Sequence, residues 1–117
     1  MAELLGVEEG KITNYVNEII ERFALGDFAD TVAMALSGGN KRKLTLAVAM
    51  MGKPKIIYID EASAGVDPVS RRQLWKAIRY EGRDSAVIMT THAMEEAEAL
   101  CQRLGVMVAG KFKCVGT

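Results

Sequence analysis

Two short apolar runs, each closed by polar side chains, constrain the fold of this chain more than any other feature. The run KIIYID at 55–60 is rich in β-branched residues and ends on Asp60, with Glu61 next. The run AVIMTTH at 86–92 has the same character and ends on His92. Apolar runs of this length indicate buried strands. Because helical patterns separate them, we expect an α/β fold with a mostly parallel sheet and flanking helices.

Apolar residues at helical spacing predict four helices in the rest of the chain. The expected helices cover residues 12–25, the segment from Ser-Gly-Gly at 37–39 to about 51, residues 70–80 and residues 93–101. The second of them has its apolar stripe at Leu44, Ala47, Val48 and Met51. The C-terminal LGVMVAGKFKCVG predicts a β-hairpin that turns at Ala109-Gly110.

The stretch LSGGNKRKL, from Leu36 to Leu44, places three basic residues in the first turn of a helix. Cations there oppose the helix dipole by about 0.3–1 kcal/mol each, whereas an anion is stabilised. Ser37 can cap the helix or donate its hydroxyl, and Gly38 and Gly39 let a ligand approach the backbone. The stretch is therefore a candidate phosphate site. The alternative is a glycine turn followed by a solvated basic helix start.

The polar residues at the two strand ends form a second candidate site, because ligands of parallel sheets gather beyond the carboxyl ends of the strands. Side chains alternate along a strand, so Asp60 and Glu61 should point in different directions. That argues against a glycosidase pair and favours one carboxylate that holds a metal ion and another that activates water. The alternatives are a solvated strand end for the two acids and a structural role for His92.

Other polar residues have simpler interpretations. Asp67-Pro68 precedes a helix and predicts a turn and a helix cap. Trp75 predicts core or interface packing, and the acidic run from Glu95 to Glu98 predicts a solvated helix face.

Composition excludes several function classes. Lys plus Arg equals Asp plus Glu, 15 each, so no net charge draws the chain to nucleic acid or to anionic lipid. Cys101 and Cys114 are too far apart for a Cys-x-x-Cys motif and suit a reducing cytosolic setting. The longest nearly apolar run, Leu44 to Met51, is far short of the roughly 20 residues of a membrane helix. We therefore expect a soluble chain.

The order and spacing of LSGGN, IIYIDEASAGVDP and a strand ending TTH closely resemble the C-terminal half of an ABC transporter nucleotide-binding domain, over residues from about 10 to 117. Asn40 and the run HAMEEAEALCQRLGVMVAGKFKCVGT are most similar to the A-subfamily, largely lipid transporters. The resemblance implies a partial P-loop NTPase fold, ATP and Mg²⁺ as cofactors, and ATP hydrolysis coupled to transport, with lipid as the expected cargo. It implies a place on the cytoplasmic face of a membrane.

The resemblance also implies roles for the glycine-rich stretch. Leu36 to Asn40 would be the signature motif, in which Ser37 and Gly39 contact the γ-phosphate of an ATP bound to the opposite subunit. Ala64 to Asp67 would be the D-loop that crosses the seam of a head-to-tail dimer. The expected partners are a second nucleotide-binding domain and the transmembrane domains of the transporter, with no nucleic acid.

The strand ends would hold the hydrolytic groups of the family. Asp60 would be the Walker B aspartate, which reaches Mg²⁺ largely through water, and Glu61 the catalytic glutamate that polarises the attacking water. His92 would be the switch histidine that contacts the γ-phosphate. One departure is Ala62, where the family usually has proline. It loosens the loop but removes no chemical group.

The phosphate-binding motif G-x-x-x-x-G-K-[ST] is missing from the sequence. GVEEGKI, from Gly6 to Ile12, has one residue too few between its glycines and Ile12 in place of a hydroxyl. The adenine-stacking aromatic and the glutamine loop of the family are missing too. We expect residues 1–52 to be part of the helical subdomain and 53–117 the C-terminal part of the ATPase core.

The absent P-loop strand would lie between the strands at 86–90 and 104–108, so we expect a gap with exposed strand edges. Folding in isolation is therefore doubtful, and we expect little or no ATP hydrolysis by this chain without the Walker A half of its domain. Two alternatives stay open. One is a non-transport ABC-type ATPase of DNA repair, chromosome structure or translation, and the other a truncated, non-enzymatic interaction module.

Overall fold

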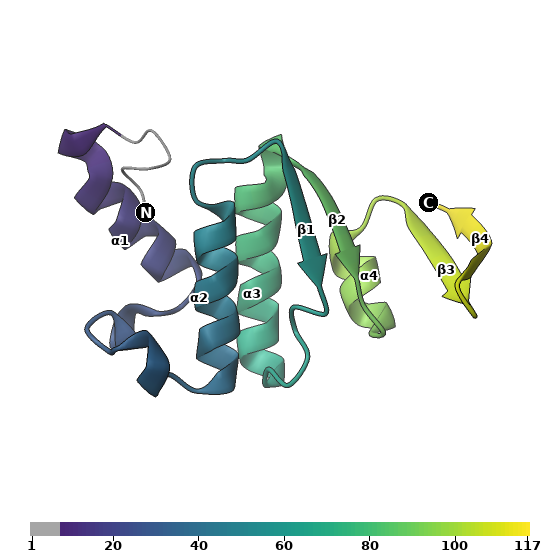
Figure 1. Ribbon diagram of the computed structural model, residues 1–117, viewed down its shortest axis with the longest axis horizontal. Coiled ribbons are helices and arrows are strands. Elements are labelled where there is room, and N and C mark those ends of the chain that lie inside the picture. Colours follow the sequence, from purple (N-terminus) through teal and green to yellow (C-terminus); the bar gives the residue numbers. More distant parts are fainter. Residues whose placement is uncertain (1–7) are drawn as a thin grey trace.

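The computed structural model of the protein describes residues 8–117. Figure 1 shows a helical N-terminal part, two strands beside two long helices, and a hairpin at the C-terminal extremity. The helices are α1 (Ile12–Arg22), α2 (Gly38–Met50), α3 (Pro68–Glu81) and α4 (Met94–Leu100). The strands are β1 (Ile56–Asp60), β2 (Ala86–Thr90), β3 (Leu104–Val108) and β4 (Lys111–Gly116). Short 3-10 turns lie at Glu9–Lys11, Gly26–Phe28, Ala33–Ala35 and Gly82–Asp84.

The strands form two separate sheets. β1 pairs in parallel with β2, from Ile56 opposite Ala86 to Asp60 opposite Thr90. β3 pairs antiparallel with β4, and within residues 8–117 neither strand of this hairpin pairs with β1 or β2. The expected α/β fold, parallel pairing and C-terminal hairpin are confirmed. The break expected between β2 and β3 is also present in this structure.

Helix α1 follows its apolar positions but ends before the predicted residue 25. Ile19 and the adjoining Phe23 are buried in the core. Ala24 adopts a positive φ of 50°, and the N–H groups of Ala24 and Leu25 donate to carbonyls of the last helical turn. A left-handed residue closes a helix in this way. The helix therefore stops at Arg22.

Helix α2 begins where Ser37 caps it, since the Ser37 hydroxyl accepts a hydrogen bond from the Asn40 N–H at 3.3 Å. Its buried face is displaced from the predicted stripe, so that prediction is wrong in part: Leu44 and Val48 are only half-buried. A long aliphatic stem lets a lysine join an apolar face, and Lys43 does so here. The buried positions of the helix are Lys43, Leu46, Ala47 and Met50.

Helix α3 starts two residues earlier than predicted. The Asp67 carboxylate accepts hydrogen bonds from the N–H groups of Val69 and Ser70, at 3.1 and 2.9 Å. Proline at the first helical position has no N–H to satisfy, so Pro68 joins the helix. The predicted apolar positions of this helix are all buried, namely Leu74, Ala77 and Ile78.

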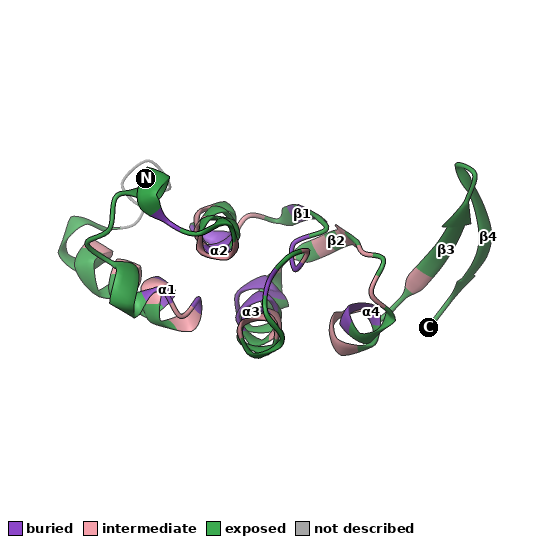
Figure 2. Ribbon diagram, turned by 90° about the horizontal axis from the view of Figure 1, so that it is seen from below, coloured by how far each residue is buried: buried purple, intermediate pink, exposed green. Residues whose placement is uncertain are grey.

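The parallel pair is covered on one face only, so the prediction of buried strands holds for one face and is wrong for the other. Ile57 and Ile59 are in the core, whereas Ile56 and Ile88 are exposed and Tyr58 is 76% exposed. In Figure 2, α3 and α4 lie on one side of β1 and β2. No element of the described part covers the other side. Alternating burial of apolar residues follows from this one-sided packing.

None of the helices within residues 8–117 combines the length and the apolar character needed to cross a membrane.

Candidate functional site

The carboxyl ends of β1 and β2 bring together the residues that the sequence placed there. The Thr90 hydroxyl donates a hydrogen bond to the Asp60 carboxylate, and the Glu61 N–H donates to the Thr90 carbonyl at 3.1 Å. The His92 Nδ1 lies 3.5 Å from Glu61 Oε1. Asp60 and Glu61 thus have different partners, as the alternation of side chains predicted. The Glu61 and His92 side chains are 54% and 74% exposed, so solvent and ligands reach both.

The backbone of Glu61 has an unusual conformation that the sequence did not reveal. Its φ is +45°, in the left-handed region that residues other than glycine rarely adopt. Three contacts hold it there: its own N–H bond to Thr90, a 2.9 Å hydrogen bond from Arg42 to its carbonyl, and a 3.1 Å bond from the Ala64 N–H to the same carbonyl. Such conformations persist where neighbouring contacts fix them, and they cluster at functional sites.

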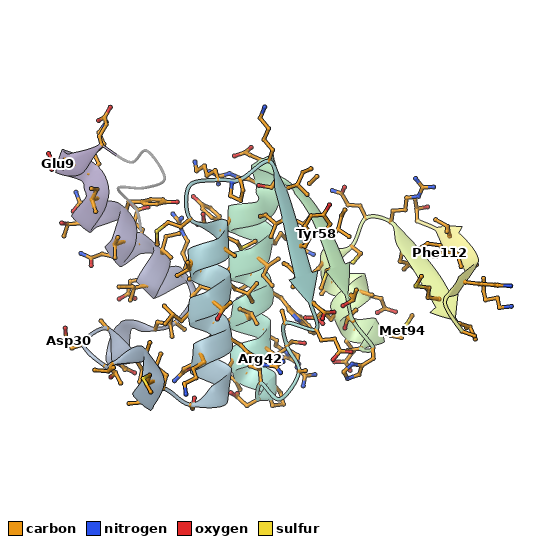
Figure 3. All side chains as sticks on the ribbon, viewed as in Figure 1. Glu9, Asp30, Arg42, Tyr58, Met94 and Phe112 are labelled. Atoms are coloured by element: carbon orange, nitrogen blue, oxygen red, sulfur yellow. The ribbon has the colours of Figure 1, made fainter. Side chains whose placement is uncertain are left out.

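The sequence alone indicated that the basic residues at the start of α2 face an anion. In the structure, not all of them do so. Arg42 donates instead to the Glu61 carbonyl, and Figure 3 shows it at the end of the molecule toward which β1 and β2 run. Lys43 is buried, and its charge contributes to lowering the pKa of Asp67. The Arg42 hydrogen bond therefore joins α2 to the loop that follows β1. Lys41 stays exposed.

The glycine-rich turn itself is open. Ser37 and Gly38 are exposed, Gly39 and Asn40 are half-buried, and Leu36 is buried beneath them. A Cβ added at either glycine would meet no heavy atom within 4 Å. A ligand can therefore approach this backbone closely, as the sequence predicted from the absence of side chains.

The loop from Ala64 to Asp67 ends in the cap of α3. Gly65 has a φ of +73°. The hydroxyl and the N–H of Ser70, with the Val69 N–H and the Lys43 charge, hold the pKa of Asp67 below its ordinary value of 3.8. Hydrogen bonds to the ionised form have this effect. The predicted turn and cap are confirmed.

A shallow polar pocket joins this loop to the strand ends and to the start of α4. Its walls include both Glu61 and His92. Together with them, the pocket is lined by Ser63, Ala64, Gly65, Arg71, Thr91, Ala93 and Glu96.

Glu96 corrects the prediction of a solvated acidic face on α4. Its side chain is only 1% exposed, and it accepts hydrogen bonds from Trp75 Nε1 at 3.0 Å and from the Thr91 hydroxyl at 2.6 Å. Glu95 and Glu98 point to solvent as predicted. Helical geometry turns Glu96 inward with Ala97. The signal in the sequence was Trp75, because a buried indole N–H requires a partner.

The oxygen ligands at the strand ends suit a hard cation such as Mg²⁺ that keeps several water molecules. Asp60 offers an exposed carboxylate next to the Thr90 hydroxyl. Within residues 8–117, no group of three or more His, Cys, Asp or Glu side chains is arranged to hold a metal ion. A metal bound at Asp60 would therefore take most of its ligands from water or from a bound phosphate.

Comparison with protein families identifies the class. The family model described as ABC transporter matches residues 2–64, more than half of the chain. The chain belongs to the ABC transporter family.

Curated relatives that match this chain carry A-family names. The human glucosylceramide transporter ABCA12 is 46% identical over 117 residues, which cover 99% of this chain and 4% of the relative. The bovine retinal-specific phospholipid-transporting ATPase ABCA4 is 47% identical over 119 residues, covering 99% and 5%. ABC transporter A family member 5 of Arabidopsis thaliana is 53% identical over 91 residues, covering 78% and 10%. The resemblance to the A-subfamily is confirmed.

Solved structures agree on the fold. An ATP-binding subunit of an ABC transporter matches with a TM-score of 0.80 and 23% identity, covering 99% of this chain and 50% of that one. An ATP-binding cassette of an ABC transporter matches with a TM-score of 0.74 and 25% identity, covering 93% and 43%. The chain thus spans about half of these solved chains and 4% to 10% of the curated relatives above.

Proposed function

We propose that this chain is the C-terminal half of an ATP-hydrolysing domain of an A-subfamily ABC transporter. Residues 1–52 are the helical subdomain portion that ends in the signature helix, and residues 53–117 are the C-terminal part of the ATPase core. The observation that supports this most directly is the pair of Glu61 and His92, 3.5 Å apart at the ends of two parallel strands. The two sheets are separate, which supports a strand from another segment that lies between β2 and β3 in the sheet of the complete domain.

The chain contributes the groups that act on water and on the reacting phosphate. Bound MgATP supplies the phosphoanhydride bond that is cleaved. Asp60 would hold Mg²⁺, largely through water, and the Glu61 carboxylate would accept a hydrogen bond from the attacking water and orient it. His92 contacts the γ-phosphate, close enough to Glu61 for both to act on one reaction centre. The fixed backbone of Glu61 keeps its carboxylate aimed at that centre.

The glycine-rich turn serves a second copy of the site. Ser37, Gly38, Gly39 and Asn40 contact the γ-phosphate of an ATP held by a second nucleotide-binding domain in a head-to-tail dimer, with Leu36 packed below. The open space around the two glycines supports this close approach. Asp67 ends the D-loop that crosses the seam.

Hydrolysis by the complete domain drives transport by transmembrane domains, from the cytoplasmic face of the membrane. Lipid is the proposed cargo, since relatives named above are called glucosylceramide and phospholipid transporters. The balance of 15 basic and 15 acidic residues favours no nucleic acid partner.

The test compares MgATP hydrolysis by the complete domain, in which this chain is joined to a Walker A segment, with hydrolysis by residues 1–117. Glu61→Gln in the complete domain should lower kcat by about 10² or more, the usual contribution of a positioned general base. Glu95→Gln, an exposed acid outside the pocket, is the matched control and should leave kcat unchanged. Turnover by residues 1–117 that Glu61→Gln abolishes would contradict the division of the site.

A further inference from the structure

The buried carboxylate of Glu96 lies directly beneath the segment that presents His92. Glu96 is in the first turn of α4, and its side chain is 1% exposed. Both carboxylate oxygens accept hydrogen bonds, Oε1 from the Trp75 indole at 3.0 Å and Oε2 from the Thr91 hydroxyl at 2.6 Å. A buried charge is stable only where it is hydrogen-bonded in this manner. The buried Glu96 carboxylate therefore needs the Thr91 hydroxyl as a hydrogen-bond donor, and the Thr91 hydroxyl is held in place by this acceptor.

The Thr91 hydroxyl makes two hydrogen bonds, one of which closes a turn around His92. It accepts a hydrogen bond from the Ala93 N–H at 3.0 Å and donates its one proton to Glu96. Because a backbone N–H only donates, the Thr91 oxygen accepts from Ala93, and its single proton remains available for the Glu96 carboxylate. Thr91 and Ala93, the residues on either side of His92, are thus linked through the Thr91 hydroxyl oxygen. His92 stands at the apex of this turn with its side chain exposed toward Glu61.

We propose that Glu96 is a positioning residue for His92 and acts through the Thr91 hydroxyl. This proposal rests on the ATPase function proposed above. Glu96 holds the turn from Thr91 to Ala93 so that the imidazole stays within reach of Glu61 and of the γ-phosphate, while its bond to Trp75 fixes the carboxylate against α3.

The first test measures ATP hydrolysis by the complete nucleotide-binding domain. Thr91→Val removes both hydroxyl bonds with little change in shape, and should lower kcat by about tenfold or more with little change in KM. Displacing a reacting group by about 1 Å costs up to about a hundredfold. Thr91→Ser keeps the hydroxyl and should restore kcat. Thr45→Val is the matched control, because Thr45 is exposed and its hydroxyl donates only to the Lys41 carbonyl.

Repeating Thr91→Val in a His92→Ala background distinguishes a role of the turn through His92 from a purely structural role. If the turn acts through His92, the substitution has no further effect on kcat once the imidazole is gone. An equal fold-loss in both backgrounds would overturn the proposal.

The second test needs no catalysis. The sample is the complete domain, and the ¹H–¹³C ring signals of His92, the sole histidine of residues 1–117, are identified by their loss in His92→Ala. Glu96→Gln and Thr91→Val should both shift or broaden those signals, whereas Thr45→Val should leave them in place. Unchanged ring signals in the first two variants would overturn the positioning role. An inactive wild-type domain with shifted ring signals would instead refute the ATPase function and leave the turn established.

Discussion

The ion pair between α1 and α3 gives a stability prediction that tests the packing directly. Arg22 pairs with Glu81, whose side chain is 2% exposed, while the Arg22 side chain is 29% exposed. The guanidinium also lies 4.1 Å from the centre of the Tyr80 ring. Burial opposes the charged form of Arg22, but the hydrogen bond and charge of Glu81 outweigh it and raise the Arg22 pKa. The Glu81 carboxylate is more deeply buried than the Arg22 guanidinium and has less access to water.

Replacing Arg22 by methionine keeps much of the stem but leaves the Glu81 carboxylate buried and unpaired. Breaking a buried pair by removing one partner costs about 3–5 kcal/mol. Water can enter from the exposed side of Arg22, so we expect Arg22→Met to lower the free energy of unfolding by about 2–3 kcal/mol. The double variant Arg22→Met with Glu81→Leu removes the orphaned charge and should lie within about 1 kcal/mol of wild type.

The assay is urea-induced unfolding of the complete domain, followed by circular dichroism. Glu18→Gln is the control, because Glu18 also pairs with Arg22, at 3.2 Å, but is 60% exposed. It should change the free energy of unfolding by less than about 0.5 kcal/mol. The reasoning is refuted if Arg22→Met is as stable as the control, or if the double variant is no more stable than Arg22→Met.

Three further predictions concern single positions. Because the folded-state pKa of Asp67 is lowered, its stabilisation is present above the ordinary pKa of 3.8 and is lost as pH falls through the lower folded value. Asp67→Ala should thus destabilise more at pH 7 than near pH 2 in thermal unfolding, and an equal effect at both would refute this. Burial, with a smaller effect of the Glu96 charge, raises the pKa of the Cys101 thiol. At pH 8, iodoacetamide should therefore modify the exposed Cys114 several-fold faster than Cys101, as measured by mass spectrometry. Equal rates at the two thiols would contradict this prediction. Gly82→Ala should cost about 1–3 kcal/mol in urea unfolding, since its Cβ would lie 2.9 Å from a Val87 methyl, and a neutral substitution would show that Val87 moves aside.

The local chemistry of the chain predicted most of its elements. Some correct predictions depend only on residues near in sequence, namely the turn at Ala109-Gly110 and the caps at Ser37 and Asp67. The meeting of Glu61 with His92 depends on the general behaviour of parallel strands. Such features follow from short-range rules, and the structure agrees with them.

The features that the sequence missed depend on three-dimensional neighbours. The burial of Glu96 requires Trp75, 21 positions away, and the bond from Arg42 to the Glu61 carbonyl crosses 19 positions. The exposed face with Tyr58 could not be read from periodicity, because an apolar run looks the same whether one or two layers cover it. The left-handed Glu61 has no signal in its residue type.

The division of the ATP site between this chain and another segment is tested most directly by isothermal titration calorimetry of MgATP into residues 1–117. Without the loop that grips the β- and γ-phosphates, we expect binding weaker than about 1 mM. The complete domain measured in the same buffer should bind MgATP at least tenfold more tightly. Micromolar affinity of residues 1–117 alone would contradict the account.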